Sequence, residues 1–143
     1  MIGIVLFTHA HLGQGLVEAV ELIAGKQENV AAVGLVHGDG VERFEERCRA
    51  AIEAVNEGDG VLALVDFCGG TPANTALRCM REKAFPCVAG VNMPMLLEAA
   101  TSRDQNLTPQ ELADLCMDVG TSGIVRMEVL MEKLADSENG DEF

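Results

Sequence analysis

His9 and Asp66 are the residues whose types and positions first suggest chemistry. His9 comes just after the apolar segment 2–7, and Asp66 comes directly after the apolar segment 61–65. A carboxylate at the end of a buried strand is costly unless it is paired or hydrogen-bonded. One that accepts a hydrogen bond from an imidazole nitrogen fixes the tautomer and leaves the other nitrogen as a nucleophile. The two residues are therefore a candidate nucleophile and its orienting carboxylate.

Two simpler interpretations apply to the same residues. His9 can be a surface histidine at a strand end, and Asp66 can serve as a helix cap or form a hydrogen bond within its loop. The pairing depends on the strands that precede them being neighbours in the sheet.

A glycine turn, Gly69-Gly70, follows Asp66 and leads into Thr71-Pro72. Thr71 followed by proline is typical of an N-cap and first helical position, so we expect a helix over 71–82. Free backbone N–H groups at such a start can bind an anion. The turn lacks the lysine of a nucleotide-binding loop, so beside a nucleophilic histidine it indicates a phosphoryl-binding site at Gly69, Gly70 and Thr71.

The other two histidines, His11 and His37, also follow apolar segments. Together with His9 and Asp66 they could be drawn as a metal site. No HExxH motif or cysteine pair at metal-ligand spacing supports that interpretation, and we expect no metal and no other cofactor.

These candidate residues require a parallel sheet to bring them together. Nearly continuous apolar runs at 2–7, 30–36, 61–65 and 87–91 indicate strands buried on both faces. Helical patterns lie between and after them, at 16–23, 41–55, 71–82, 94–100 and from Thr108, where Thr108 and Glu111 have capping-box spacing. The chain is predicted to be an α/β protein with an open, doubly wound, mainly parallel sheet of order 2-1-3-4 and helices on both faces.

The composition excludes several classes of partner. The 143 residues include 10 Lys and Arg against 23 Asp and Glu, a net charge of −13, with neither Trp nor Tyr. Nucleic acid and anionic membrane surfaces are poor partners for such a chain. No run approaches the ~18 apolar residues of a membrane span. Five cysteines without CxxC spacing indicate reduced, mostly buried thiols, and we expect a cytoplasmic protein.

The C-terminal part has a different character. An apolar segment at 124–131 follows a glycine-containing loop, and residues 136–143 are polar and acidic. We expect one domain over 1–135 and a disordered tail over 136–143. A compact four-stranded sheet does not obviously need the apolar segment 124–130, so we predict that the protein is a homodimer.

Three sequence blocks carry a family resemblance: residues 7–9 (FTH), 64–72 (LVDFCGGTP) and 89–96 (AGVNMPML). In order and spacing they resemble the IIA component of the mannose family of the bacterial sugar phosphotransferase system, over roughly residues 2 to 130. Ala10 departs from the glycine that the family often has there, and Cys68 stands where a larger aromatic is common.

The resemblance implies a phosphoryl relay. It implies that His9 carries the phosphoryl group, that Asp66 orients it, and that Gly69, Gly70 and Thr71 lie against it. It further implies the phosphocarrier HPr as donor, a IIB domain as acceptor, and a homodimer in which a C-terminal strand completes the partner's sheet.

Two other functions remain open. A similar domain serves as the phosphotransferase subunit of dihydroxyacetone kinase, with a different acceptor. A non-catalytic flavodoxin-like binding or receiver module is a third possibility, although a receiver would need clustered acids after the first strand, where Thr8 and His9 stand.

Overall fold

The computed structural model describes residues 1–137 and builds them around one four-stranded parallel sheet. The strands are β1 (Gly3–His9), β2 (Val30–Leu35), β3 (Val61–Val65) and β4 (Cys87–Ala89). The helices are α1 (Leu12–Ala24), α2 (Val41–Val55), α3 (Gly70–Glu82), α4 (Met93–Ser102), α5 (Pro109–Ser122) and α6 (Met127–Asp136). The strand order is β2-β1-β3-β4, and every pair is parallel, which confirms the predicted topology.

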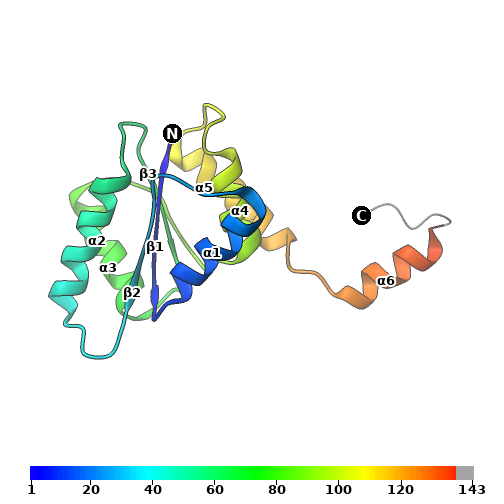
Figure 1. Cartoon of the computed structure of the whole chain (residues 1–143), viewed down its shortest axis with the longest axis horizontal. Coiled ribbons are helices and arrows are strands. Elements are labelled where there is room, and N and C mark those ends of the chain that lie inside the picture. Colours follow the sequence, from blue (N-terminus) through cyan, green and yellow to red (C-terminus); the bar gives the residue numbers. More distant parts are fainter. Residues whose placement is uncertain (138–143) are drawn as a thin grey trace.

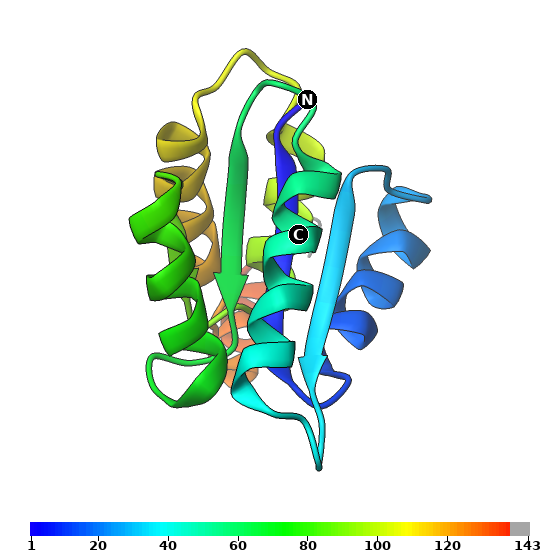
Figure 2. The same cartoon turned by 90° about the vertical axis from the view of Figure 1, so that its left-hand side faces the viewer.

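Helices cover both faces of the sheet. In Figure 1, α2 and α3 lie on one side of it and α1, α4 and α5 on the other. Figure 2 looks onto the first of these faces, with the carboxyl ends of the strands together at the lower end of the sheet. Strands buried on both sides explain why their sequences are apolar without alternation.

Two apolar clusters hold the layers together, one on each face of the sheet. β1 divides its side chains between them, with Val5 and Phe7 on the α2–α3 side and Ile4 and Leu6 on the other. All four side chains are fully buried. The central strand is therefore fixed from both sides, and His9 at its end starts from a rigid position.

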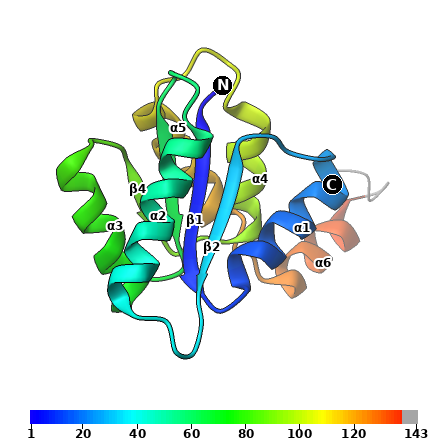
Figure 3. The same cartoon turned by 60° about the vertical axis from the view of Figure 1, so that its left-hand side comes forward.

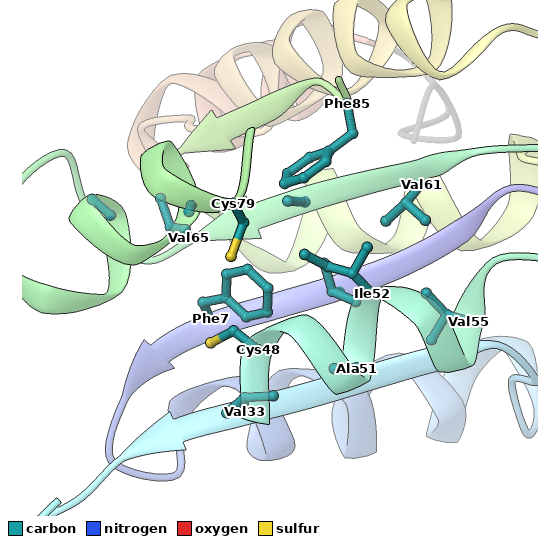
Figure 4. Close-up of a cluster of buried hydrophobic side chains, with 14 of the residues drawn as sticks. Phe7, Val33, Cys48, Ala51, Ile52, Val55, Val61, Val65, Cys79 and Phe85 are labelled. Atoms are coloured by element: carbon teal, nitrogen blue, oxygen red, sulfur yellow. The ribbon is translucent and has the colours of Figure 1, made fainter. Parts of the chain in front are cut away.

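Three of the five thiols are buried in these cores, in line with the prediction of mostly buried thiols, whereas Cys68 is exposed and Cys87 is partly buried. Cys48 and Cys79 lie near Phe7 in the cluster under α2 and α3 (Figure 4), and Cys116 is buried on the other face. Burial raises the pKa of Cys48 and of Cys79, which keeps both protonated and unreactive.

Helix starts follow local sequence signals, with one difference. The capping box of Thr108 and Glu111 is formed, and Asn92 caps α4 by accepting the Met95 N–H at 3.0 Å. The helix predicted from Thr71 instead begins at Gly70, with Gly69 as its N-cap. Two glycines with positive φ allow the chain to turn into the helix two residues earlier than a cap at Thr71 would.

The C-terminal strand that the family resemblance implies is not seen in this structure. Residues after Gly123 form a short irregular stretch and then the helix α6, which has no buried residue and extends away from the sheet (Figures 1 and 3). Met, Glu and Leu from 127 onward favour a helix over a strand, and within residues 1–137 no strand pairs with this segment. Asp136 is the last residue of α6, and the rest of the predicted tail, from 138, lies outside the described residues.

Candidate active site

The order of the strands brings His9 and Asp66 together. β1 lies between β2 and β3, and Phe7 is in register with Val65. His9 is the last residue of β1 and Asp66 follows β3 directly, so both reach the carboxyl edge at adjacent positions. The connections leave β1 and β3 toward opposite faces of the sheet there, which opens a crevice for a ligand.

The hydrogen bonds between these two residues define the state of the imidazole. His9 Nδ1 lies 2.8 Å from Asp66 Oδ2, and the backbone N–H of His9 donates to the same oxygen at 2.9 Å. An ionised carboxylate only accepts hydrogen bonds, so Nδ1 must carry the proton. The lone pair is thereby placed on Nε2. The His9 side chain is 42% exposed, whereas that of Asp66 is only 9% exposed.

The environment of Asp66 keeps its carboxyl group ionised. Burial acts to raise the pKa of Asp66, but hydrogen bonds from the backbone and the ring of His9 outweigh it, and the net pKa lies below the ordinary value. Asp66 Oδ1 also accepts the Phe67 N–H at 3.1 Å. The carboxylate is thus available to balance a positive charge on His9.

The loop after β1 is pinned on both sides of His9. The buried hydroxyl of Thr8 accepts the N–H of Gly13 at 2.9 Å, which fixes the first turn of α1. Ala10 donates its N–H to the Leu35 carbonyl at 2.7 Å and has φ of 50°. The chain therefore leaves β1 through a left-handed residue that is tied to β2.

The glycine turn lies against the imidazole. Gly70 has φ of 75°, and a Cβ there would stand 3.4 Å from both Cε1 and Nε2 of His9. The first residue of α3 therefore lies close to Nε2 of His9. The free N–H groups at the start of a helix can bind an anion. Gly69, by contrast, packs against the Phe67 ring, since a Cβ there would stand 3.2 Å from its Cε2.

An open cleft of about 520 Å³ lies beside His9. Thr71 lines it, as does His37 from the loop after β2. The structure thus brings His9, Asp66, Gly70 and Thr71 to one place. Gly69 lies against Phe67 instead of against the imidazole. His11 is exposed at the start of α1 and is not among the residues that line this cleft.

The metal interpretation finds no support in the geometry. Within residues 1–137, no three or more His, Cys, Asp or Glu side chains are close enough to hold a metal ion. His37 lies instead in a loop in which Asp39 accepts the Val36 N–H at 2.9 Å.

Among the helices within residues 1–137, none is both long and apolar enough to cross a membrane.

Sequence reasoning missed Phe67 as a site residue. Its ring stacks on the His9 imidazole, with the ring centroids 5.2 Å apart. The only signal is its place directly after Asp66, which does not show which way the side chain turns.

Comparisons with known proteins identify the family of this chain. A family model described as "PTS system fructose IIA component" matches residues 3–116. The mannose-specific EIIAB component of Escherichia coli is 36% identical over 124 residues, which are 86% of this chain and 38% of that protein. The chain thus spans well under half the length of that relative. The fructose-specific EIIA component of Bacillus subtilis is 34% identical over 105 residues, 73% of this chain and 72% of that one.

A solved structure shows the same fold. The phosphotransferase system component EIIA of Streptococcus agalactiae superposes with a TM-score of 0.81 at 27% sequence identity, covering 90% of this chain and 99% of that one. The matched family model covers the whole carboxyl edge at which His9, Asp66 and the glycine turn meet. The chain therefore belongs to the EIIA family of the mannose, fructose and sorbose type, the phosphotransferase components of the sugar phosphotransferase system.

Proposed function

We propose that His9 accepts a phosphoryl group on Nε2 and passes this group on to an acceptor. Asp66 is proposed to orient the imidazole ring of His9. The observation that carries this proposal is the contact between His9 Nδ1 and Asp66 Oδ2 at 2.8 Å. It leaves Nε2 unprotonated and therefore nucleophilic without any transfer of a proton. The half-exposed ring of His9 remains within reach of a partner protein.

The transfer balances without a cofactor. The lone pair of Nε2 forms a new N–P bond to the phosphoryl group of a phosphohistidine donor. The donor's N–P bond breaks, and its electron pair stays on the donor nitrogen. The His9 ring keeps its Nδ1 proton and becomes a cation, which Asp66 stabilises. Positioning and charge stabilisation are the main demands of phosphoryl transfer, and both are met by residues of this edge.

The start of α3 is proposed to bind the phosphoryl oxygens. Gly70 and Thr71 are the first residues of this 13-residue helix, and Gly70 approaches Nε2 without a side chain in between. Backbone N–H groups there favour the negative charge that accumulates on the oxygens. Gly69 supports the turn through its positive φ.

The proposed partners are phosphorylated HPr as donor and a IIB unit as acceptor, with the reaction in the cytoplasm. Support comes from the family and from the printed name of the Escherichia coli relative, an EIIAB component. The relatives named here are specific for mannose and fructose, which favours a sugar-uptake system over service to dihydroxyacetone kinase. We assign no particular sugar.

A homodimer is proposed as the state in which the C-terminal segment is covered. Ile124, Met127 and Met131 are 65–75% exposed in one copy of the chain. An apolar groove beside the edge strand β4 and α3, lined in part by Leu77 and Ala89, offers a place for such a segment from a second copy. Edge strands favour this kind of coverage. In such a dimer, each copy would form one domain over residues 1–135, and the second copy would cover its exposed C-terminal segment.

Incubation with phosphorylated HPr, followed by mapping of the acid-labile phosphate, tests the proposed function. We expect the phosphate on His9, no labelling of His9→Ala, and nearly full labelling of the matched variants His11→Ala and His37→Ala. Phosphate on His11, on His37 or on neither would overturn the assignment. Omitting either the donor or the IIB acceptor would separate acceptance from onward transfer.

A further inference from the structure

Phe67 is an exposed aromatic side chain that lies on the face of the nucleophilic imidazole. The residue is 53% exposed. The two rings stack with centroids 5.2 Å apart and an angle of 18° between their planes. A phenyl ring half in water contributes little to a core, so a local role must explain its position.

The backbone of Phe67 is anchored to the same carboxylate as His9. Its N–H donates to Asp66 Oδ1 at 3.1 Å, while Asp66 Oδ2 receives the two hydrogen bonds of His9. One dipeptide, Asp66-Phe67, therefore contacts the imidazole twice. The carboxylate meets the edge of the ring at Nδ1, and the phenyl group meets its face.

The glycine turn limits where the phenyl ring can go. A Cβ at Gly69 would stand 3.2 Å from Phe67 Cε2, and one at Gly70 would stand 3.6 Å from Cζ. The same Cβ at Gly70 would lie 3.4 Å from His9 Cε1 and Nε2. Glycines at these positions thus let the backbone approach both rings closely without covering Nε2.

A single hydrogen bond cannot fix the plane of an imidazole ring. The contact between Nδ1 and Asp66 Oδ2 sets one distance, but the ring can still turn about that line. A flat partner on the ring face removes this freedom, because stacked rings lose their contact when one of them rotates. The face of an aromatic ring also attracts a cation, and the His9 ring becomes one when it carries the phosphoryl group.

We propose that Phe67 is a positioning residue for phosphoryl transfer, one that holds the plane of the His9 ring so that Nε2 points at the donor. The proposal rests on the proposed role of His9. Fixed orientation of a nucleophile increases the rate within the bound complex rather than the affinity for the partner. A side chain that only contacts the partner would instead change the affinity for the partner and leave the rate within the complex unchanged.

Two variants separate the aromatic face from mere apolar bulk. Phe67→Tyr keeps the ring, whereas Phe67→Leu keeps an apolar side chain without a flat face. Leu22→Ala, at an exposed leucine of α1 that lines no part of the cleft, serves as the matched control. The measurement is the rate of His9 phosphorylation against the concentration of phosphorylated HPr.

We expect the maximal rate of Phe67→Leu to fall about tenfold, with little change in the half-saturating HPr concentration. Phe67→Tyr and Leu22→Ala should keep the wild-type values. An unchanged maximal rate in Phe67→Leu, or a change confined to the half-saturating concentration, would overturn the proposal.

Nuclear magnetic resonance of the unphosphorylated protein gives a readout that needs no transfer. The His9 ring protons should move downfield in Phe67→Leu, because the shielding by the stacked phenyl ring is lost, and should stay in place in Phe67→Tyr. Unmoved signals in Phe67→Leu would show that the stack is not populated and defeat the proposal. A phosphate mapped away from His9 would instead defeat the proposed function, even if the stack were confirmed.

Discussion

One oxygen of Asp66, Oδ2, accepts both the backbone N–H of His9, at 2.9 Å, and the N–H of its ring at Nδ1. The carboxylate therefore holds the strand end and the side chain of His9 at once. This double contact makes the tautomer of the imidazole a consequence of the fold of β1 and β3, not of the loop alone. The role proposed for Asp66 in orienting the ring and its contact with the backbone of His9 thus involve the same oxygen atom.

Asp66→Asn should slow phosphorylation of His9 by about a hundredfold or more while the fold is kept. If the amide turns its NH₂ toward Nδ1, the imidazole must place its proton on Nε2, which removes the nucleophilic lone pair. An amide also cannot balance the positive charge of phosphohistidine. Rapid-quench measurements with phosphorylated HPr give the rate, and circular dichroism checks the fold. A folded variant with a wild-type rate would contradict the role given to Asp66.

Acidification should remove the stability that Asp66 contributes. Its folded-state pKa is lowered below the ordinary value of 3.8, so the contribution is fully present above that value and is lost as the pH falls through the folded-state pKa. The free energy of unfolding of the wild type, minus that of Asp66→Asn, should therefore decrease below about pH 4. Denaturant titrations at several pH values measure it. A difference that stays constant down to about pH 2 would exclude a lowered pKa.

Ala10→Gly should stabilise the protein by about 1 kcal/mol. Ala10 has φ of 50°, a left-handed conformation that costs an L-residue about 1–2 kcal/mol and glycine nearly nothing. Part of that gain is offset, because glycine loses more freedom on folding. The sequence shows only that alanine stands where the family often has glycine. The structure adds that the backbone of Ala10 is in the left-handed conformation, which is strained for alanine. Denaturant midpoints would measure the change.

Ala54→Gly is the matched control for that variant. Ala54 is exposed in the helix α2, where the same chemical change should destabilise by about 0.5–1 kcal/mol. Opposite signs at the two positions are the expected result. Destabilisation at both would show that Ala10 is not strained.

Much of this site can be predicted from sequence because it depends on strands. Apolar runs buried on both faces identify the four strands, and the order 2-1-3-4 then places His9 beside Asp66. The edges of the elements are harder to predict, since they depend on backbone angles. α3 begins at Gly70 instead of after Thr71, and β4 ends at Ala89 before Gly90, whose φ is 88°.

Features that depend on side-chain direction cannot be read from the sequence. Phe67 follows Asp66, but nothing in the order of residues shows that its ring turns onto His9. Arg103 counts as one more charge in the composition, yet its side chain is almost completely buried. The segment after Gly123 has apolar residues with mixed periodicity, so the pattern alone does not predict the helix α6 that forms there.

Replacing the buried Arg103 by methionine should destabilise the protein by about 2–4 kcal/mol. Its guanidinium donates to the carbonyls of Ile2, Glu28 and Asn29, which precede β1 and β2. Methionine fills similar space but leaves these acceptors without their donor. Arg81→Met, at the exposed end of α3, should change the stability by less than about 0.5 kcal/mol. Equal effects of the two substitutions in thermal unfolding would show that the buried hydrogen bonds contribute nothing.

Removal of the C-terminal segment should abolish the proposed dimer. Residues 124–136 expose Ile124, Val125 and Met127 along a helix and a linker that bury nothing in their own copy. Exposed apolar side chains in such a series stabilise an assembly once a second copy covers them. A chain that ends at Ser122 should therefore sediment as a monomer or aggregate, whereas the full chain should sediment as a dimer. The shorter deletion of 138–143 is the control, and it should change neither the oligomeric state nor the melting temperature. If the chain that ends at Ser122 remained a well-folded dimer in the ultracentrifuge, the interface would have to lie elsewhere on the molecule.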